Sequence, residues 1–266
     1  MKVLRGRRGL VTGAAAGIGR SIALALAKEG VDLALLDLDR DGLEHVAEEV
    51  GQLGVEAVTF VADVADPEQV SGCLASLRAD PRGLHILINN AGVLHFDRLE
   101  RTTLEDWDRV LDVNLRAPIR LVHELLPLLR AQDEAHIVNV GSLAGLVARR
   151  RLAAYGTSKS GLIGLSLGLR AELGPAIGVS VVCPGVIDTG LVDAARDTGH
   201  TRRRRPPARL AGSPERVAAR TLTAIRRDRA LVIVTAHARA LWWLQRLSPY
   251  ILDAHQQWRN RRRQRR

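Results

Sequence analysis

A chain of 266 residues, of which 46% are apolar, can bury a sizeable core as one large α/β domain or two small ones. Its formal net charge of +10 equals the charge of two arginine runs, four residues at positions 202–205 and six between positions 259 and 266. The rest of the chain is therefore neutral, which argues against nucleic-acid binding by the body of the protein.

The remaining composition excludes further classes of protein. The two cysteines, Cys73 and Cys183, form no C-x-x-C pair and no His/Cys cluster has metal-ligand spacing, so we expect reduced thiols and no metal. No apolar run reaches the ~18–20 residues of a transmembrane helix. The basic N-terminus resembles the start of a signal peptide, but glycines interrupt the segment after it and no cleavage site follows. We therefore expect a cytoplasmic protein.

The first predicted strand, residues 9–11, leads into the motif T-G-A-A-A-G-I-G at positions 12–19 and then into a helix that ends near Gly30. Glycines at such a turn allow the backbone to approach a pyrophosphate at the helix N-terminus, although their spacing differs from the general dinucleotide fingerprint. The apolar strand 31–36 follows and ends in Asp37, where an acid can accept hydrogen bonds from the adenosine ribose. The alternative is that Asp37 only caps the next helix.

Strands and helices continue to alternate along the chain, and the strands end in polar residues. Strand 57–62 ends in Asp63-Val64, and strand 84–88 ends in N-N-A-G at positions 89–92. Strands that are apolar on both faces and alternate with helices are typical of a parallel sheet covered on both sides. We therefore predict an α/β fold, a doubly wound parallel sheet (Rossmann fold) in a single domain. The other predicted elements are helices 40–53, 103–130 and 153–173, a helix that starts at Pro67, and strands 135–140, 179–182 and 231–235.

Tyr155 and Lys159 lie four residues apart near the start of predicted helix 153–173. Positions i and i+4 share one helix face, so the phenol and the ammonium project side by side. Lowering the pKa of a free tyrosine from about 10 to about 7 takes roughly 4 kcal/mol, and an ammonium at about 4–5 Å supplies ~3–4 kcal/mol. The pair can therefore provide a phenolate base, and Ser142, after the preceding strand, can hold a substrate oxygen. Alone, a Tyr-x3-Lys pair is more often a solvated lysine beside a half-buried tyrosine.

Seven motifs follow one another in register along this chain. They are T-G-A-A-A-G-I-G at 12–19, Asp63, N-N-A-G at 89–92, Asn114, Ser142, Tyr155-x3-Lys159, and Pro184-Gly185 with Thr189. In their order and spacing they resemble the short-chain dehydrogenase/reductase family, and the resemblance covers about residues 7–236.

The resemblance implies a role for each of these residues. Tyr155 would be the catalytic acid/base, and Lys159 would lower its pKa and hold the nicotinamide ribose. Ser142 would bind the substrate oxygen, and Asn114 would position a water that links Lys159 to solvent. The family also implies direct hydride transfer, no metal, and a homodimer or homotetramer. The implied cofactor-binding residues are Gly13, Gly17, Ile18 and Gly19 at the pyrophosphate, Asp63 and Val64 at the adenine, Asn90, Tyr155, Lys159, and Ile187 and Thr189 at the nicotinamide amide.

Residues beside these motifs refine the expectation. Pro118 has no N–H, so it leaves the Asn114 carbonyl without its helical partner and free to accept from that water; the alternative is an ordinary helix kink. The Asp37 carboxylate would pair with the ribose hydroxyls of NAD and repel the 2′-phosphate of NADP. Members that prefer NADP usually carry a base where this chain has Ala16 and Leu38. We therefore expect NAD as the cofactor, with NADP less suited.

The C-terminal end is where the family varies most. We predict a catalytic domain at residues 1–236, with a substrate lid at about 190–212 that contains the arginine run, and an extension at residues 237–266. The extension has a short predicted helix, 238–247, and three of the four tryptophans. Aromatic residues beside a basic cluster suit peripheral contact with an anionic membrane. The alternative is that these rings pack over the pocket or at a subunit interface.

Three functions remain open. The first is an oxidoreductase that transfers a hydride between NAD(H) and a lipophilic small-molecule secondary alcohol or ketone. The second is a carrier-linked 3-ketoacyl reductase that uses NADPH and docks an acidic carrier on residues 202–205, against which Asp37 argues. The third is a non-catalytic nucleotide-binding protein. The complete set of Asn114, Ser142, Tyr155 and Lys159 argues against that third function.

Overall fold

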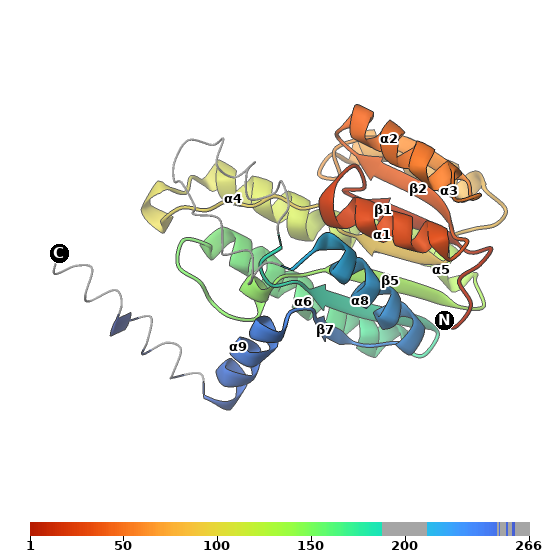
Figure 1. Cartoon of the computed structure of the whole chain (residues 1–266). Coiled ribbons are helices and arrows are strands. Elements are labelled where there is room, and N and C mark those ends of the chain that lie inside the picture. The colour runs from red at the N-terminus through yellow and green to blue at the C-terminus, as the bar shows by residue number, and fades with distance from the viewer. Residues whose placement is uncertain (188–211, 249, 251–253, 255–256, 259–266) are drawn as a thin grey trace.

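The computed structural model describes residues 1–187, 212–248, 250, 254 and 257–258. This described part contains one sheet of seven parallel strands in the order β3-β2-β1-β4-β5-β6-β7 (Figure 1). The chain runs outward in both directions from the junction of β1 and β4, so the predicted doubly wound sheet is confirmed. The strands are β1 (Arg8–Thr12), β2 (Asp32–Asp37), β3 (Ala57–Val61), β4 (Ile86–Asn89), β5 (Ala135–Val140), β6 (Ile177–Cys183) and β7 (Leu231–Ile233).

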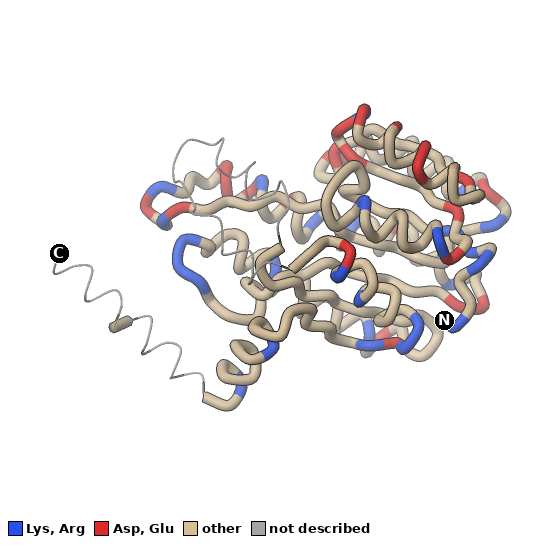
Figure 2. Tube along the Cα trace, viewed as in Figure 1, with Lys and Arg blue, Asp and Glu red and all other residues tan. Residues whose placement is uncertain are grey.

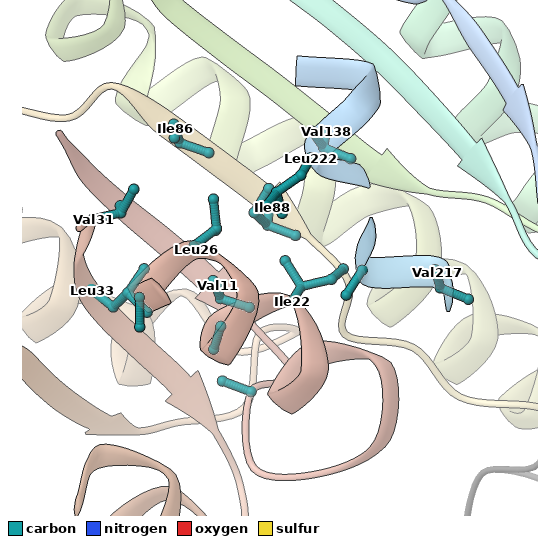
Figure 3. Close-up of a cluster of buried hydrophobic side chains, with 14 of the residues drawn as sticks. Val11, Ile22, Leu26, Val31, Leu33, Ile86, Ile88, Val138, Val217 and Leu222 are labelled. Carbon is teal, nitrogen blue, oxygen red and sulfur yellow. The ribbon is translucent and has the colours of Figure 1, made fainter. Parts of the chain in front are cut away.

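Helices cover both faces of the sheet, because its central strands are apolar on both sides. On one face α1, α2 and α8 pack an aliphatic cluster against the sheet, with Ile22 and Leu26 fully buried (Figure 3). On the other face α3, α5 and α6 bury Leu74, Leu125 and Leu173. The helices are α1 (Gly17–Lys28), α2 (Arg40–Gly51), α3 (Pro67–Ala79), α4 (Leu104–Leu111), α5 (Ala117–Arg130), α6 (Ala153–Leu173), α8 (Pro214–Arg227) and α9 (Ala236–Leu247), with short turns η1 (Leu99–Arg101), η2 (Asp112–Arg116) and η3 (Leu143–Gly145).

The predicted helix 103–130 is interrupted. After α4 the chain makes one π-helical turn, η2, in which the Ala117 N–H bonds to the Asp112 carbonyl, and α5 follows. Pro118 stands at the start of α5 and has no N–H, so it cannot pair with the Asn114 carbonyl. The prediction of one continuous helix is therefore wrong, and the contact of the Asn114 carbonyl with a water stays a prediction. Turns of this kind are frequent at functional sites.

The helix α9 packs its N-terminal half against the body of the protein. Ala238 is fully buried and joins a cluster with Leu143 and Val147, and Leu241 packs against this cluster. Trp243 is 52% exposed. The start of the predicted extension therefore packs against the segment that follows Ser142 in the chain.

Two further observations concern the membrane and the lid. Within the described ranges, no helix combines the length and the apolar character needed to cross a bilayer. The predicted lid up to residue 211, the arginine run at 202–205 and the arginines of 259–266 lie outside the described residues.

Candidate active site

A cavity of about 820 Å³ opens at the carboxyl ends of the strands. Its lining residues follow or end different strands: Gly13 after β1, Asp37 at the end of β2, Asn90 after β4, Ser142 after β5 and Pro184 after β6. In open α/β sheets ligands bind at this edge, beside the point where the strand order reverses. The topology thus brings residues that are distant in sequence to one site.

The glycine-rich loop between β1 and α1 forms one end of the cavity and has no room for side chains. A Cβ on Gly19 would lie 1.8 Å from the Gly13 carbonyl oxygen, and Gly13 and Gly17 have φ values of +64° and +54°. The Asn90 amide fixes the loop, donating to the Thr12 and Gly13 carbonyls at 2.9 and 3.0 Å. The N-cap residue of α1 is an alanine without a side-chain cap, so the first N–H groups of this helix suit an anion. The loop therefore fits a pyrophosphate.

The Asp37 carboxylate links this loop to β2. Its Oδ2 accepts from the Ala15 N–H at 3.0 Å, and its Oδ1 accepts from the Leu38 and Asp39 N–H groups at 2.7 and 3.2 Å. The N-cap of α2 is Asp39, whose carboxylate accepts from the Gly42 N–H. The alternative that Asp37 only caps this helix is therefore wrong. Each carboxylate oxygen has a second lone pair, so Asp37 can still accept from ribose hydroxyls.

The loop after β3 forms the next part of the wall, where Asp63 and Val64 line the cavity. The Asp63 carboxylate accepts from the Ala65 N–H at 2.8 Å, and the Asp63 N–H donates to the Gln69 side chain at 2.9 Å. Arg120 on α5 donates to the Val64 carbonyl. The loop is therefore fixed by protein contacts, as a binding surface for a flat base requires.

Tyr155 and Lys159 project into the other end of the cavity from the first turns of α6. The Lys159 Nζ lies 5.9 Å from the centre of the Tyr155 ring and donates to the Val140 carbonyl at 2.9 Å. Both side chains are buried, Tyr155 to 8% exposure and Lys159 to 4%. Burial lowers the pKa of Lys159 to about 8. The predicted pairing of phenol and ammonium on one helix face is present.

Ser142 reaches the same cavity because η3 packs closely on α6. Its Oγ accepts from the Ala144 N–H at 3.1 Å, which leaves the hydroxyl proton for a substrate oxygen. A Cβ on Gly145 would lie 2.7 Å from the Lys159 main chain, so only glycine permits this approach. The contact places Ser142 and Tyr155 on one wall.

Asn114 is fully buried in η2 and ties the loop after β4 to α6. Its Oδ1 accepts from the Val93 N–H at 2.8 Å, and its Nδ2 donates to the Val93 carbonyl at 2.9 Å and to the Ser158 Oγ at 3.1 Å. Ser158 in turn donates to the Tyr155 carbonyl at 2.8 Å. Because the side chain is occupied, the predicted water contact would use the main-chain carbonyl of Asn114.

Sequence reasoning missed three residues of this site. Thr12 accepts from the Asn90 and Ala91 N–H groups, both at 3.0 Å, and Ser158 makes the link just described. Both stand beside predicted residues, which is the signal that could have found them. Arg149 lines the cavity and begins a run of three arginines.

The remaining predicted residues are placed as follows. Ile18 and Asn90 line the cavity at the glycine-rich loop. Ile187 lines it after β6, is 7% exposed and forms a bridge with Gly212. Thr189 lies outside the described residues. In the parts of the chain that are described, no group of three or more His, Cys, Asp or Glu residues could hold a metal ion.

Comparison with known proteins identifies the family of this chain. A sequence model described as "short chain dehydrogenase" matches residues 8–199. The chain belongs to the short-chain dehydrogenase/reductase family. The predicted resemblance is therefore confirmed.

Three relatives show the spread of activities in this family. The chain is 33% identical over 258 residues to the probable oxidoreductase EphD of Mycobacterium tuberculosis, a match that covers 91% of this chain and 43% of that protein. It therefore spans less than half the length of this relative. It is 35% identical over 211 residues to the cyclohexanol dehydrogenase of an Acinetobacter species, covering 79% and 83% of the two chains. The 3-oxoacyl-[acyl-carrier-protein] reductase FabG of Staphylococcus aureus is 36% identical over 190 residues, covering 71% and 77%.

Solved structures agree with the fold over nearly the whole chain. A short-chain dehydrogenase/reductase from Burkholderia phymatum in complex with NAD superimposes with a TM-score of 0.83 at 28% identity, covering 95% of this chain and 97% of that one. A short-chain dehydrogenase from Sphingobium yanoikuyae in complex with NADPH gives 0.79 at 28% identity, covering 94% of both. Similar structures thus hold either cofactor.

Proposed function

We propose that this protein is an NAD-dependent oxidoreductase that interconverts a lipophilic secondary alcohol and the corresponding ketone. The observation that carries the proposal is one continuous cavity with the glycine-rich loop at one end and Tyr155, Lys159 and Ser142 at the other. A dinucleotide bound on the loop would extend toward these three side chains. A protein that only binds a nucleotide does not need a buried lysine beside a tyrosine, so this pair favours a catalytic function.

The roles follow from the contacts of each side chain. In the oxidation direction the Tyr155 phenolate accepts the hydroxyl proton of the alcohol, and the nearby Lys159 ammonium favours that phenolate. Ser142 donates a hydrogen bond to the substrate oxygen and so holds it next to Tyr155. The nicotinamide cofactor, when bound, supplies the acceptor for the hydride from the carbinol carbon. Asn114 positions α6 through Ser158, and positioned acid–base groups of this kind contribute about 10²–10⁴-fold.

The substrate end of the cavity has an apolar wall. Ala144, Leu152 and Tyr155 form a buried cluster there, against which Leu94 and Phe96 pack. Apolar surface of this kind gains roughly 25 cal/mol per Å² when a ligand removes it from water. We therefore propose a lipophilic substrate; the cyclohexanol dehydrogenase relative is compatible with it.

The preference for NAD rests on Asp37. Its carboxylate lines the cavity at the end of β2, beside Leu38, and Ala16 stands in the glycine-rich loop. A carboxylate accepts from two ribose hydroxyls and repels a phosphate, while neither neighbouring side chain offers a positive charge to that phosphate. The second candidate is a carrier-linked 3-ketoacyl reductase that uses NADPH, and the relative that favours it is the FabG reductase.

We also make four wider proposals, which concern domain organisation, packing of the extension, assembly and location. These are a catalytic unit at residues 1–236 with an extension at 237–266, packing of the start of that extension on the catalytic unit rather than on an anionic membrane, a homodimer or homotetramer, and a cytoplasmic location. Exposed Leu104, Ile119 and Leu167 on α4, α5 and α6 support an oligomer, because large apolar side chains at a surface favour association.

The proposed function is tested with Tyr155→Phe and a panel of hydrophobic secondary alcohols assayed with NAD and with NADP. We expect the native chain to oxidise members of the panel with NAD. The variant should lose at least about 10²-fold in kcat, because it lacks the acid–base group, while its affinity for NADH changes only a few-fold. Residual turnover close to that of the native chain would remove Tyr155 from the mechanism.

A further inference from the structure

Three consecutive arginines, Arg149, Arg150 and Arg151, occupy the loop between η3 and α6 and have no part in the proposed chemistry. Arg149 and Arg150 are exposed, and Arg151 is half-buried. The loop before α6 appears in Figure 2 as a continuous basic stretch. It places three positive charges within six residues of Tyr155 in a chain whose body is otherwise close to neutral.

Contacts with the substrate wall hold this loop in place. Arg151 has a φ of 64°, a left-handed conformation that residues with a Cβ seldom adopt. Its guanidinium lies 5.9 Å from the centre of the Phe96 ring, within the range of a cation–π contact. Phe96 in turn packs on the cluster formed by Leu152 and Tyr155. The basic loop is therefore fixed to the apolar wall of the active site.

Arg149 is the member of the run that lines the cavity itself, together with Leu152 and Tyr155. Among the described residues, Arg149 forms no ion pair with a carboxylate. The other charged side chains of the lining lie elsewhere: Asp37 and Asp63 at the ends of β2 and β3, Arg109 and Asp112 on and after α4, and Lys159 on α6. Within the described lining, Arg149 is thus the one charged residue contributed by the segment between Ser142 and Tyr155.

One of the carboxylates that line the cavity, that of Asp112, already has a cationic partner. Asp112 pairs with Arg116 at 2.6 Å, four residues later on the same turn. In the described part of the chain, Arg149 therefore presents a guanidinium without a carboxylate partner next to an apolar wall. A guanidinium binds carboxylates and phosphates in a bidentate manner.

We propose that Arg149, supported by Arg151, binds an anionic group of the substrate, a carboxylate or a phosphate, at the end of an apolar chain whose carbinol reacts at Tyr155. The inference rests on the proposed function and narrows its substrate class from lipophilic alcohols to amphiphilic hydroxy or oxo acids and phosphate esters. The anionic group makes and breaks no bond. It fixes how far the chain enters the cavity and so which carbon reaches Tyr155.

The first test measures binding by calorimetry with the full chain. The probes are decanoate, decyl phosphate and the neutral decan-2-ol. Decanoate or decyl phosphate should bind about tenfold more weakly to Arg149→Gln, the loss of one charge-assisted contact, and Arg149→Lys should recover part of that loss. Decan-2-ol should bind all variants equally. The matched control is Arg227→Gln, which removes one exposed charge at the end of α8 and should bind like the native chain.

The two anions separate the possible sources of the charge. Preference for decanoate indicates a hydroxy or oxo acid, and preference for decyl phosphate indicates a phosphate ester. Failure of the full chain to bind either anion, or equal binding by the native chain and Arg149→Gln, overturns the proposal. A loss of equal size in Arg227→Gln overturns it as well, because the effect would then be one of net charge alone.

The second test uses turnover, so that a failure of this proposal is distinguished from a failure of the proposed function. The substrates are a decanoate with a hydroxyl on its penultimate carbon and the methyl ester of that acid. The native chain should favour the acid in kcat/KM, and Arg149→Gln should lower kcat/KM for the acid about tenfold with the ester unchanged. Equal use of acid and ester by both proteins overturns the anion site while leaving the oxidoreductase intact. Arg149-dependent anion binding with no alcohol turnover overturns the proposed function and leaves the anion site standing.

Discussion

The buried ammonium of Lys159 should reduce the stability of the fold at neutral pH, and Lys159→Met should therefore stabilise it. The side chain is 4% exposed, and burial lowers its pKa from 10.5 to about 8. Each pKa unit corresponds to about 1.4 kcal/mol, so burial of the charge costs about 3 kcal/mol at pH 7. The variant loses the hydrogen bond to the Val140 carbonyl, which offsets about 1 kcal/mol. We expect the unfolding free energy of Lys159→Met to exceed that of the native chain by about 2 kcal/mol. The variant should have little or no catalytic activity.

The pH dependence gives the sharper measurement. Below pH 8 the lysine is charged in both the folded and the unfolded chain, so its full destabilising effect is present. Between pH 8 and 10.5 the folded chain loses this proton before the unfolded chain does, and the native protein gains stability relative to the variant. The difference in unfolding free energy should shrink by about 2–3 kcal/mol over this range.

Urea denaturation of both proteins at several pH values between 7 and 10 measures this difference. Lys28→Met is the matched control, because Lys28 is exposed on α1 and its charge is not buried. Its stability relative to the native chain should hardly vary with pH. A difference for Lys159→Met that stays constant across the range would refute the reasoning, since no proton would then be linked to folding at this site.

Two further changes test the cofactor and the C-terminal end. NAD should exceed NADP in kcat/KM by more than about tenfold in the native chain, and Asp37→Asn, which keeps the shape and removes the charge, should narrow this ratio in steady-state assays; equal native use of both cofactors contradicts the expectation. Truncation after Thr235 removes Ala238 and Leu241 from the wall beside Leu143, so it should raise KM and lower the unfolding free energy by at least about 1 kcal/mol. Full-length and truncated chains should both stay free of anionic vesicles in co-sedimentation, whereas binding by the full-length chain alone would favour membrane contact instead.

Much of the fold could be predicted because its signals are local. The strand at 135–140 and the helix at 153–173 begin and end where the sequence predicts. One is a short segment rich in apolar residues, and the other keeps its apolar residues at helical spacing. The edge strand β7 was predicted two residues too long, because it is only half-buried and pairs with one neighbour. Pairing of this kind depends on the rest of the sheet.

The predicted site residues that the structure describes do line one cavity or touch its wall, but their contacts could not be read from the sequence. Asn114 meets Ser158 over a separation of 44 residues, and Asp37 meets the Ala15 N–H over 22. Such contacts depend on how the helices cross the sheet. A sequence motif indicates which residues form the site, but it does not indicate which other residues form hydrogen bonds with them.

The double use of Asp37 constrains how this protein could change its cofactor in evolution or by design. The same carboxylate that faces the cavity also holds the glycine-rich loop through the Ala15 N–H and the following turn through Leu38. Replacing it by a small or basic residue removes the repulsion of a phosphate but also releases the loop that must bind the pyrophosphate. If the proposed preference for NAD holds, a switch to NADP would require a second substitution that restores the loop, and a base in place of Ala16 alone would meet the unchanged carboxylate. We therefore expect cofactor preference to depend on at least two positions, so that single-site variants lose affinity for NAD before they gain affinity for NADP.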